Sequence, residues 1–309
     1  MNDIKQAAKI IKAGGLVAFP TETVYGLGAD AFNQQACLNI FRTKGRPSNN
    51  PLIVHIASLG QAKQIADFND DALRLAEFWP GPLSLVLPKK EKSQLAESVS
   101  VGLATIAIRI PSDKVALKLI ESSGHPIAAP SANKSGRLSP TTYEHVKSNF
   151  GDEVFVLNSG KGSSYGLEST IVDVTTTIPT ILRYGFITPE AIESVLGKKV
   201  AIASRLSKIK APGMLHHHYA PHTKLRINAG TLEEGEVGLN FADSRLDAPG
   251  SLNLSSSGDL SEAAANLFDY LHQLDEFALN NGIKTIAVAA IPNQSVGLAI
   301  NDRLTRAVE

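Results

Sequence analysis

Two cations stand close together in a short loop that contains two prolines. Lys44 and Arg46 are separated by one glycine, and Pro47 and Pro51 follow. Proline fixes φ and lacks a backbone N–H, so this segment is neither a helix interior nor a central strand. Fixed positive charge where a loop meets an apolar strand can bind an anion, and a solvated surface loop is the alternative.

Other polar side chains recur at the ends of apolar runs. They are arginines, hydroxyl residues and one amide: Arg109, Arg183, Ser131, Ser169 and Asn133. Polar groups at the strand ends of open α/β folds gather where ligands bind. Several cations without an acidic neighbour in sequence favour a polyanion such as a nucleotide triphosphate, which the hydroxyls and the amide would orient.

The signatures of several other chemistries are missing. The sequence has no Gly-x-Ser-x-Gly elbow and no His-Glu-x-x-His motif, and its Gly/Ser segment 160–166 lacks the Walker and Gly-x-Gly-x-x-Gly spacings. No carboxylate stands out as a general base. A single cysteine, Cys37, excludes an intrachain disulfide; a buried structural thiol is expected there, with a catalytic nucleophile as the alternative. His55 lies in an apolar run, where a core histidine is the simpler interpretation.

Alternating helices and strands must position these residues. Helices are expected over 3–13, 33–43, 59–66, 70–79, 113–122, from 141 or 142, 187–196, 261–279 and 295–308. Strands are expected over 16–20, 52–56, 83–87, 105–111, 126–130, 154–157, 169–174, 179–183, 224–227, 236–241, 251–254 and 285–290. Residues 21–28 should lead from a strand into a hydroxyl-rich loop, and residues 88–100 should be polar and exposed.

Length and composition indicate an ordinary globular protein with two domains. The chain has 309 residues, of which 43% are hydrophobic and 19% charged. Periodicity stops between residues 204 and 223, where Pro, Gly and His cluster, so we expect a domain at 1–203, a linker at 204–223 and a smaller α/β domain at 224–309. Thirty basic and 30 acidic residues cancel, which argues neither for nor against nucleic acid.

The linker carries a run of histidines. His216, His217, His218 and His222 lie within seven residues, and both a metal site and a linker that touches ligand remain open. No apolar run reaches the roughly 18 residues of a membrane-spanning helix. The N-terminus predicts an amphipathic helix rather than a signal peptide, so a cytoplasmic location without membrane contact is expected.

An ordered set of motifs resembles the YrdC-type threonylcarbamoyl-AMP synthase family. The motifs are Phe19-Pro20-Thr21-Glu22-Thr23-Val24-Tyr25-Gly26-Leu27, Lys44-Gly45-Arg46-Pro47, Asn50-Pro51-Leu52, Trp79-Pro80-Gly81-Pro82, Ser131-Ala132-Asn133, Gly166-Leu167-Glu168-Ser169-Thr170 and Arg183-Tyr184-Gly185. The His-Tyr-Ala-Pro segment and the second α/β unit are similar to the family's longer, two-domain form. The resemblance implies an α/β fold with a concave, twisted mixed sheet, joined by a linker to the smaller domain.

The resemblance also implies a reaction. L-Threonine and bicarbonate give a carbamate, which attacks the α-phosphorus of ATP and yields threonylcarbamoyl-AMP and pyrophosphate. No protein side chain is expected to bind metal, because Mg²⁺ would arrive with ATP. The partner would be a threonylcarbamoyl transferase complex that modifies tRNA next to the anticodon, and weak tRNA binding is possible.

Matching motif by motif, the resemblance assigns roles to individual residues. The catalytic set is Lys44, Arg46, Ser131 and Asn133. The ATP-binding set adds Asn50, Thr105, Ser139, Arg183 and linker Tyr219. The threonine-binding set is Thr23, His55, Arg109, Ser169 and, through its backbone, Ala129. The linker would act as a lid that brings Tyr219 over the pocket.

Two other functions are kept as alternatives. One is a module that binds double-stranded RNA or tRNA by shape on a concave basic surface, which the neutral net charge weakens. The other is a carbamoyl-transferring enzyme of related fold that acts on carbamoyl phosphate, which the lack of zinc-finger cysteines weakens.

Overall fold

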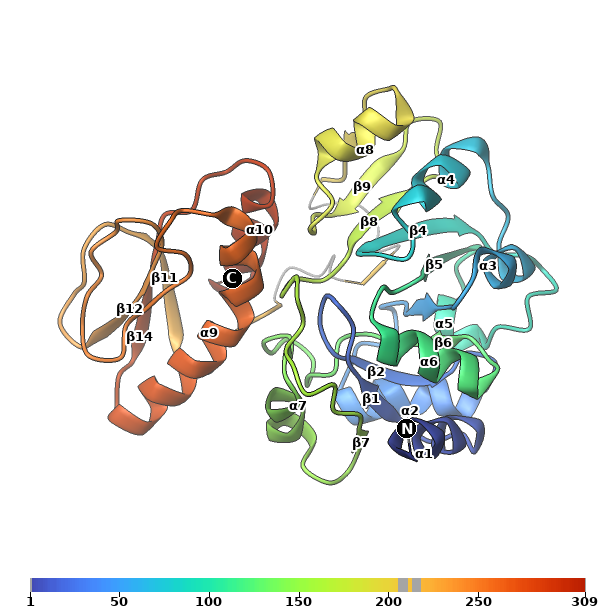
Figure 1. Ribbon diagram of the computed structural model, residues 1–309, viewed down its shortest axis with the longest axis horizontal. Coiled ribbons are helices and arrows are strands. Elements are labelled where there is room, and N and C mark those ends of the chain that lie inside the picture. The colour runs from blue at the N-terminus through green and yellow to red at the C-terminus, as the bar shows by residue number, and fades with distance from the viewer. Residues whose placement is uncertain (1, 205–210, 213–217, 309) are drawn as a thin grey trace.

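The chain folds around two separate β-sheets. The computed structural model describes residues 2–204, 211–212 and 218–308. Within these residues ten strands form one mixed sheet, and four strands form a second, smaller sheet (Figure 1). We call the parts built on them the first unit and the second unit. This arrangement confirms the predicted fold class. His216 and His217 lie outside the described residues.

The first unit is a mixed sheet with the order β10-β9-β8-β4-β5-β3-β6-β2-β1-β7. Its strands are β1 (Val17–Phe19), β2 (Gly26–Asp30), β3 (Ile53–His55), β4 (Leu83–Pro88), β5 (Thr105–Arg109), β6 (Ile127–Ala128), β7 (Phe155–Val156), β8 (Thr170–Asp173), β9 (Thr180–Arg183) and β10 (Ala201–Ile202). Parallel and antiparallel neighbours alternate in the centre, where β4 runs antiparallel to β5 and β5 runs parallel to β3. Since buried β-branched and aliphatic residues fill these central strands, both of their faces are covered.

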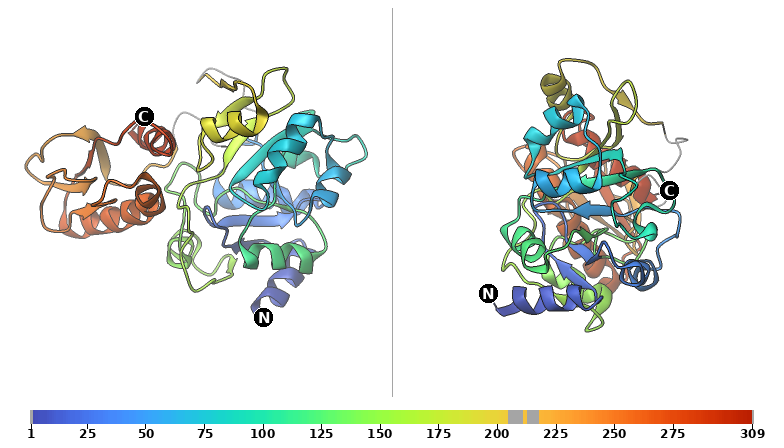
Figure 2. Two further views of the ribbon diagram at one scale, coloured as in Figure 1. Left: turned by 45° about the horizontal axis from the view of Figure 1, so that its top comes forward. Right: turned by 90° about the vertical axis from the view of Figure 1, so that its right-hand side faces the viewer.

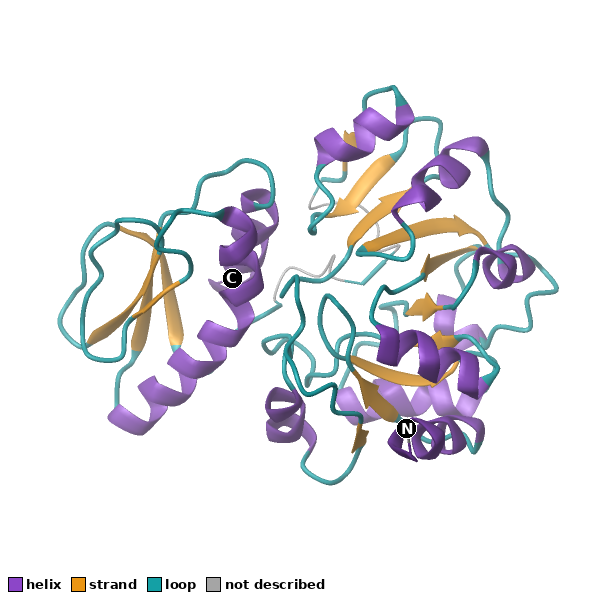
Figure 3. Ribbon diagram, viewed as in Figure 1, coloured by secondary structure: helices purple, strands orange, loops and turns teal. Residues whose placement is uncertain are grey.

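Short helices surround this sheet, as the purple ribbons in Figure 3 show. They are α1 (Asn2–Lys12), α2 (Gln34–Lys44), α3 (Leu59–Ile65), α4 (Asp70–Leu75), the 3₁₀ turn η1 (Ala76–Phe78), α5 (Glu97–Ser100), α6 (Lys114–Ser123), α7 (Tyr143–Phe150) and α8 (Pro189–Leu196). Side-chain caps fix several starts; for example, Asn33 Oδ1 accepts from the Ala36 N–H at the start of α2.

Three local predictions for the first unit were wrong. Residues Gly26–Asp30 form strand β2, because their small side chains fit the buried surface between β1 and β6. Residues 96–100 are largely buried rather than exposed, since Val99 packs into the main core. The helix expected over 70–79 ends at Leu75, and a 3₁₀ turn begins at Ala76. Each outcome depends on neighbours that are distant in sequence.

The second unit is a small parallel sheet covered by two helices. Strands β11 (Lys224–Ala229), β14 (Thr285–Ala289), β12 (Glu236–Asn240) and β13 (Leu252–Asn253) lie in that order, and every pair is parallel. Helices α9 (Leu260–Asn281) and α10 (Gly297–Val308) lie between this sheet and the first unit in both Figure 1 and Figure 2. No helix among the described residues is long and apolar enough to cross a membrane.

The two units share an apolar core. Val24, Leu138 and Leu167 of the first unit pack in one cluster with α9 residues that include Phe268. The loop at Gly166 meets α9 closely, because an added Cβ would lie 2.3 Å from the carbonyl oxygen of Ala265. Only glycine permits this approach, and its φ of +66° also favours glycine.

We expect Gly166→Ala to weaken the contact between the units. Gly197 has nearly the same φ, +67°, but open space around its Cα, so Gly197→Ala measures the conformational strain alone. We expect Gly197→Ala to lower the free energy of unfolding by about 1 kcal/mol, and Gly166→Ala by about 3 kcal/mol or more. Denaturant unfolding of both variants checks the difference, and equal losses would contradict the close contact.

Two histidines stack across the same contact. The rings of His145 on α7 and His272 on α9 lie 3.9 Å apart, and His272 Nε2 lies 3.2 Å from the Ser139 carbonyl oxygen. Burial lowers the pKa of both imidazoles to about 4, helped for His272 by the proximity of His145. Both rings are therefore neutral at pH 7.

This stacked pair predicts a loss of stability in mild acid. Since the folded pKa lies below the ordinary value of about 6.5, the unfolded chain binds more protons, and stability falls as the pH falls from 6.5 toward 4. Between pH 7 and pH 5 we expect the pair to contribute a loss of roughly 2–4 kcal/mol. Denaturant unfolding should show a shallower pH dependence in His145→Asn/His272→Asn than in the wild type, and parallel curves would refute the assignment.

Candidate functional site

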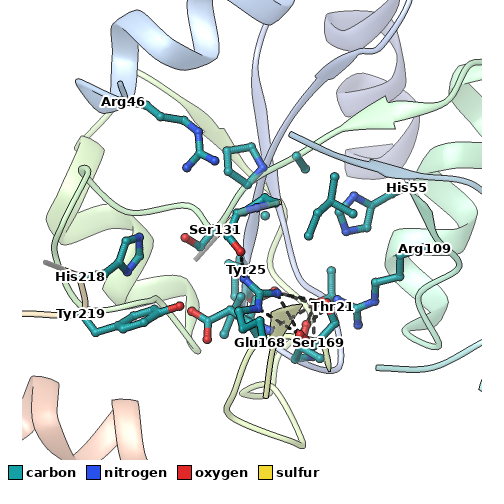
Figure 4. A pocket seen from close by; sticks show the side chains of 18 residues that line it. Thr21, Tyr25, Arg46, His55, Arg109, Ser131, Glu168, Ser169, His218 and Tyr219 are labelled. Atoms are coloured by element: carbon teal, nitrogen blue, oxygen red, sulfur yellow. Dashed lines mark hydrogen bonds between the residues drawn. The ribbon is translucent and has the colours of Figure 1, made fainter. Parts of the chain in front are cut away.

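A pocket opens in the first unit where loops from distant strands meet the linker (Figure 4). Most of the residues predicted from the sequence line it. They are Thr23, Arg46, His55, Arg109, Ala129, Ser131, Ser169, Arg183 and Tyr219. They come from β3, β5, β9 and the loops between strands, so the curled sheet brings together side chains that lie far apart along the chain.

Five predicted residues do not line this pocket directly: Lys44, Asn50, Thr105, Asn133 and Ser139. Lys44, Asn50, Asn133 and Ser139 are buried next to it through hydrogen bonds or loop contacts described below. Thr105 stands apart, because it begins β5 opposite Pro88 whereas Arg109 ends the same strand. A strand rises about 3.3 Å per residue, so these two side chains lie more than 10 Å apart.

The end of α2 delivers the two cations of the first motif. Gly45 adopts the left-handed conformation that ends this helix, with φ of 63°. Lys44 Nζ then donates to the carbonyl oxygens of Ser131, at 2.6 Å, and Asn133. Arg46 Nε donates to the Asn50 carbonyl oxygen at 3.0 Å. Both side chains therefore tie loops together as well as supplying charge.

Burial disfavours the positive charge of both Lys44 and Arg46. The pKa of Lys44 is lowered well below its ordinary value, first by burial and then by the charges of Arg46 and Lys134. Burial and the nearby Arg183 lower the pKa of Arg46 to about 9. A cluster of buried positive groups is stabilised by an anion that enters between them. The geometry therefore favours a strongly anionic ligand.

The Ser-Ala-Asn motif forms a closed turn. Ser131 Oγ donates to Asn133 Oδ1 at 2.5 Å, and Asn133 Nδ2 donates to the carbonyl oxygens of Lys134 and Arg137. The Ala132 N–H donates to the Tyr25 carbonyl oxygen, which ties this turn to the loop before β2. Asn133 is fully buried, so in this arrangement it holds the Ser131 hydroxyl at the pocket wall.

Arg109 sits at the end of β5 with three of its N–H groups engaged. Its Nη2 donates to Glu22 Oε1 at 2.6 Å, its Nη1 to Thr23 Oγ1 at 2.8 Å, and its Nε to the Gly81 carbonyl oxygen at 3.2 Å. Burial alone would raise the pKa of Glu22, but the charge and hydrogen bond of Arg109 outweigh it and lower that pKa. The cation thus has an acidic partner, Glu22, that is 87 positions away in sequence.

Arg183 lines the pocket and bonds to the linker. Its Nε and Nη2 donate to the Ser169 carbonyl oxygen, and its Nη1 donates to the Pro212 carbonyl oxygen of the linker at 3.3 Å. Ser169 Oγ lies 2.8 Å from Ser84 Oγ, which fixes its position. The neighbouring linker residue Ala211 packs into an apolar cluster with β-strand residues such as Ile53. The linker therefore forms part of the pocket wall.

One carboxylate in the pocket was missed from the sequence. Glu168 lines the cavity and is buried; it accepts hydrogen bonds from Ser139 Oγ and from Arg303 Nε at 2.9 Å. Burial would raise the pKa of Glu168, but the charges of Arg303 and Arg183 lower it to about 2. The sequence signal was an acidic residue within one motif of the resemblance, Gly166-Leu167-Glu168-Ser169-Thr170, and its cationic partner lies 135 positions away.

Several aromatic groups in the pocket carry unpartnered polar atoms. His55 Nδ1, His218 Nδ1 and Tyr219 Oη are buried and have no hydrogen-bond partner among the described residues. Burial and Arg109 lower the pKa of His55 to about 3, so its ring is neutral. His55 is therefore not a satisfied core histidine. Figure 4 shows the ring of Tyr219 across from Glu168. Such atoms are free to bind a polar ligand.

The arrangement offers positive charge and hydroxyl groups. Among the described residues no three His, Cys, Asp or Glu side chains group closely enough to hold a metal ion. Cys37 is buried, and burial raises its pKa to about 12, which makes it a structural thiol rather than a nucleophile. The pocket can bind an anion among arginines and a second group near Thr23, His55 and Ser169.

Two family profiles match the chain one after the other. A profile described as "Telomere recombination" matches residues 9–185, and one described as "Threonylcarbamoyl-AMP synthase, C-terminal domain" matches residues 187–308. Together they span nearly all of the chain.

Individual relatives are similar over the same length. Proteins named threonylcarbamoyl-AMP synthase from Pyrococcus abyssi and Bacillus subtilis are each 39% identical over 98% of this chain, which covers 93% and 92% of their lengths. The crystal structure of Pyrococcus abyssi Sua5 complexed with L-threonine matches with a TM-score of 0.89 at 39% identity, over 99% of this chain and 94% of that one.

Proposed function

The chain belongs to the threonylcarbamoyl-AMP synthase family, and from that premise we propose that it converts L-threonine, bicarbonate and ATP to threonylcarbamoyl-AMP and pyrophosphate. The observation that carries the proposal is one pocket in which Arg46, Arg109 and Arg183 converge from three distant motifs. A triphosphate and an amino-acid carboxylate are the anions that such a set suits. The enzyme is thus a nucleotidyltransferase.

On the nucleotide side, the proposed contacts surround the phosphates. Arg46 and Arg183 offer planar forks to phosphate oxygens, and Lys44 adds a point charge behind the loop that holds Ser131. Asn50 is a further candidate, because both polar atoms of its side chain are buried without a partner among the described residues. These groups would stabilise the charge that develops as the carbamate oxygen attacks the α-phosphorus and pyrophosphate leaves.

On the threonine side, the proposed contacts lie around Arg109. Its guanidinium is held by Glu22 and Thr23, so it can receive a carboxylate without reorientation. His55 is neutral and has one free ring nitrogen, which suits a hydroxyl or amine, and Ser169 and the Ala129 backbone complete the pocket wall. The threonine amine forms a C–N bond to the carbon of bicarbonate, which loses water and gives the carbamate.

Magnesium is proposed to enter with ATP rather than to occupy a protein site. Both oxygens of Glu168, the pocket carboxylate, already accept hydrogen bonds from Ser139 and Arg303. The described residues therefore offer no ready set of oxygen ligands, and the phosphates themselves would carry the ion.

We propose that the chain divides into a catalytic domain at 1–203, a linker at 204–223 and a small domain at 224–309. The profiles change near residue 186, but α8 packs against α4 and β10 pairs with β9, which keeps residues 187–203 with the first sheet. Linker residues Pro212, His218 and Tyr219 line the pocket, in support of a role as lid.

The product is a reactive mixed anhydride, so it needs an acceptor close at hand. We propose that a threonylcarbamoyl transferase complex receives it and modifies tRNA next to the anticodon, with at most weak tRNA binding by this chain. Because ATP and tRNA are both substrates of this sequence of reactions, we assign the protein to the cytoplasm.

A single incubation tests the reaction. Purified protein with ATP, Mg²⁺, bicarbonate and L-threonine should release pyrophosphate and form an adenylate detectable by mass spectrometry. Pyrophosphate release that is no greater than in a threonine-free control would refute the proposal. Salt-dependent tRNA binding without any consumption of ATP would favour the RNA-binding alternative instead.

A further inference from the structure

Arg303 is a buried arginine of the second unit that bonds to the first. It lies on α10 and is 1% exposed. Among the described residues it is the largest side chain that is fully buried. Its Nε donates to Glu168 Oε2 at 2.9 Å and its Nη2 to the Tyr184 carbonyl oxygen at 2.7 Å. Its Nη1 donates to Asp302 at 2.8 Å. One buried cation thus joins the two units at the wall of the pocket.

Glu168 connects Arg303 to the pocket, because it bonds to Arg303 and lines the pocket. It is the one carboxylate among the described residues that line the pocket, whose lining also includes Arg46, Arg109 and Arg183. Its other oxygen accepts from Ser139, a proposed nucleotide contact. Arg303 also lies over the ring of Tyr219, 5.2 Å from its centre, and that residue is a second proposed nucleotide contact. Arg303 therefore touches two pocket residues without lining the pocket itself.

An ionised carboxylate is electrostatically unfavourable in a site that binds a polyphosphate, because both groups are negative. Alone, it would repel the phosphates across a buried space in which charges are weakly screened. Paired with Arg303, it adds almost no net charge, while its oxygens still orient the Ser139 hydroxyl. Removing one member of such a buried pair leaves an uncompensated charge. Removing both takes away one charge of each sign, and Asp302, the other acidic partner of Arg303, keeps its ion pair with Arg306 at 3.0 Å.

We propose that Arg303 is a positioning residue for the nucleotide pocket: from the second unit it neutralises and orients Glu168, and so sets the affinity for ATP. This inference rests on the proposed function, because it takes the pocket's ligand to be ATP. It assigns the second unit a part in substrate binding through a single ion pair.

The inference predicts a pH signature. The charged or titratable groups that face Glu168 are Arg303 on α10, Arg183 on β9, and His218 and Tyr219 of the linker. In the wild type the Glu168 pKa of about 2 keeps the carboxylate ionised and paired at every pH from 6 to 9. Without Arg303, burial raises the Glu168 pKa. The carboxyl group is then partly neutral at the lower end of the pH range and ionised at the upper end, where its negative charge repels ATP.

The test compares Arg303→Met, Glu168→Gln and the double variant with the wild type, by ATP binding in calorimetry and by threonine-dependent pyrophosphate release. We expect Arg303→Met to bind ATP at least about tenfold more weakly at pH 8, and to recover part of this loss at pH 6. The double variant should bind ATP within about threefold of wild type, with no added pH dependence. Double-variant binding as weak as that of Arg303→Met, or normal binding by Arg303→Met, would overturn the inference.

A more exposed arginine–glutamate pair within the second unit serves as control. Arg226 Nε donates to Glu236 at 2.8 Å and neither residue lines the pocket, so Arg226→Met and Arg226→Met/Glu236→Gln should leave ATP affinity unchanged. If Arg303→Met does not fold, Arg303→Lys keeps the charge and should bind ATP within about threefold of wild type. A tenfold loss in both Arg303→Lys and the double variant would also overturn the inference.

The readouts separate this inference from the proposed function. A wild-type protein that binds ATP but releases no pyrophosphate with threonine fails the proposed function, and the ATP-binding comparison still decides the role of Arg303. A wild-type protein that makes pyrophosphate, with unaltered ATP binding in Arg303→Met, fails the inference alone.

Discussion

Replacing Lys44 by alanine is expected to lower kcat/KM for threonine-dependent pyrophosphate release by at least about 100-fold. Lys44 is fully buried, and its Nζ holds the carbonyl oxygens of Ser131 and Asn133, which places the Ser131 hydroxyl. Burial and Arg46 lower the Lys44 pKa, so its positive charge is disfavoured beside the pocket unless an anion compensates it. In the proposed function a bound triphosphate would supply that anion, so the variant would lose both a charge and the geometry of the turn.

The same substitution should also reduce stability, because two buried carbonyl oxygens lose their donor. We expect a loss of about 1–3 kcal/mol in the free energy of unfolding, which a folded domain of this size tolerates. Arg46→Ala should behave alike, because Arg46 holds the carbonyl oxygens of Asn50 and Pro51.

Circular dichroism and denaturant unfolding would separate loss of fold from loss of chemistry in these variants. Lys118→Ala is the control, since Lys118 is exposed on α6 and pairs with Glu121, its one ion-pair partner within the described part of the chain. The control should keep wild-type kinetics. Lys44→Ala with wild-type kinetics would remove this lysine from the site.

Replacing Arg109 by methionine is expected to abolish threonine recognition while sparing ATP. The guanidinium is the cation of the pocket nearest Thr23, and it alone among the described residues pairs with Glu22. We expect the KM for threonine to rise by about 100-fold or more, because a buried carboxylate without its cation is strongly disfavoured. ATP binding measured by calorimetry should change less than about threefold.

A second substitution separates loss of threonine binding from loss of stability in this test. Arg109→Met leaves Glu22 as an uncompensated buried charge, which costs about 3–5 kcal/mol of stability. Arg109→Met/Glu22→Gln removes both charges, so it should fold better and still fail to use threonine. Arg74→Met is the control, because Arg74 bonds to the Leu196 carbonyl oxygen away from the pocket. Restored threonine use in the double variant would contradict the assignment.

Much of the pocket could be predicted because its residues belong to short local patterns. Lys44 and Arg46 are placed by the last turn of α2 and its glycine cap, which depend on neighbouring residues only. Arg109 and Arg183 end β5 and β9, so an apolar run followed by a cation was a sufficient signal. The structure brings these strand ends together around one cavity. The resemblance had assigned both arginines to substrate binding, Arg183 to ATP and Arg109 to threonine.

Other features could not be predicted, because they depend on pairs of residues far apart in sequence. Glu22 and Arg109 lie 87 positions apart, and only the fold brings them together. The sequence assigned no role to Glu168, since its partner Arg303 lies in the other unit. The sequence did not predict strand β2, because its glycines and alanine have weak strand preference and are held in place by β1 and β6.

The sequence by itself determined the α/β class and the set of cations and hydroxyls that suits a phosphorylated ligand. Only the tertiary structure decided how the charges of that set are balanced. Local patterns fix which groups stand at strand ends, since they depend on adjacent residues. The burial and the partners of an ionised group depend instead on the whole chain, which is why the prominent Lys44 anchors a turn and the inconspicuous Arg303 stabilises the pocket's carboxylate.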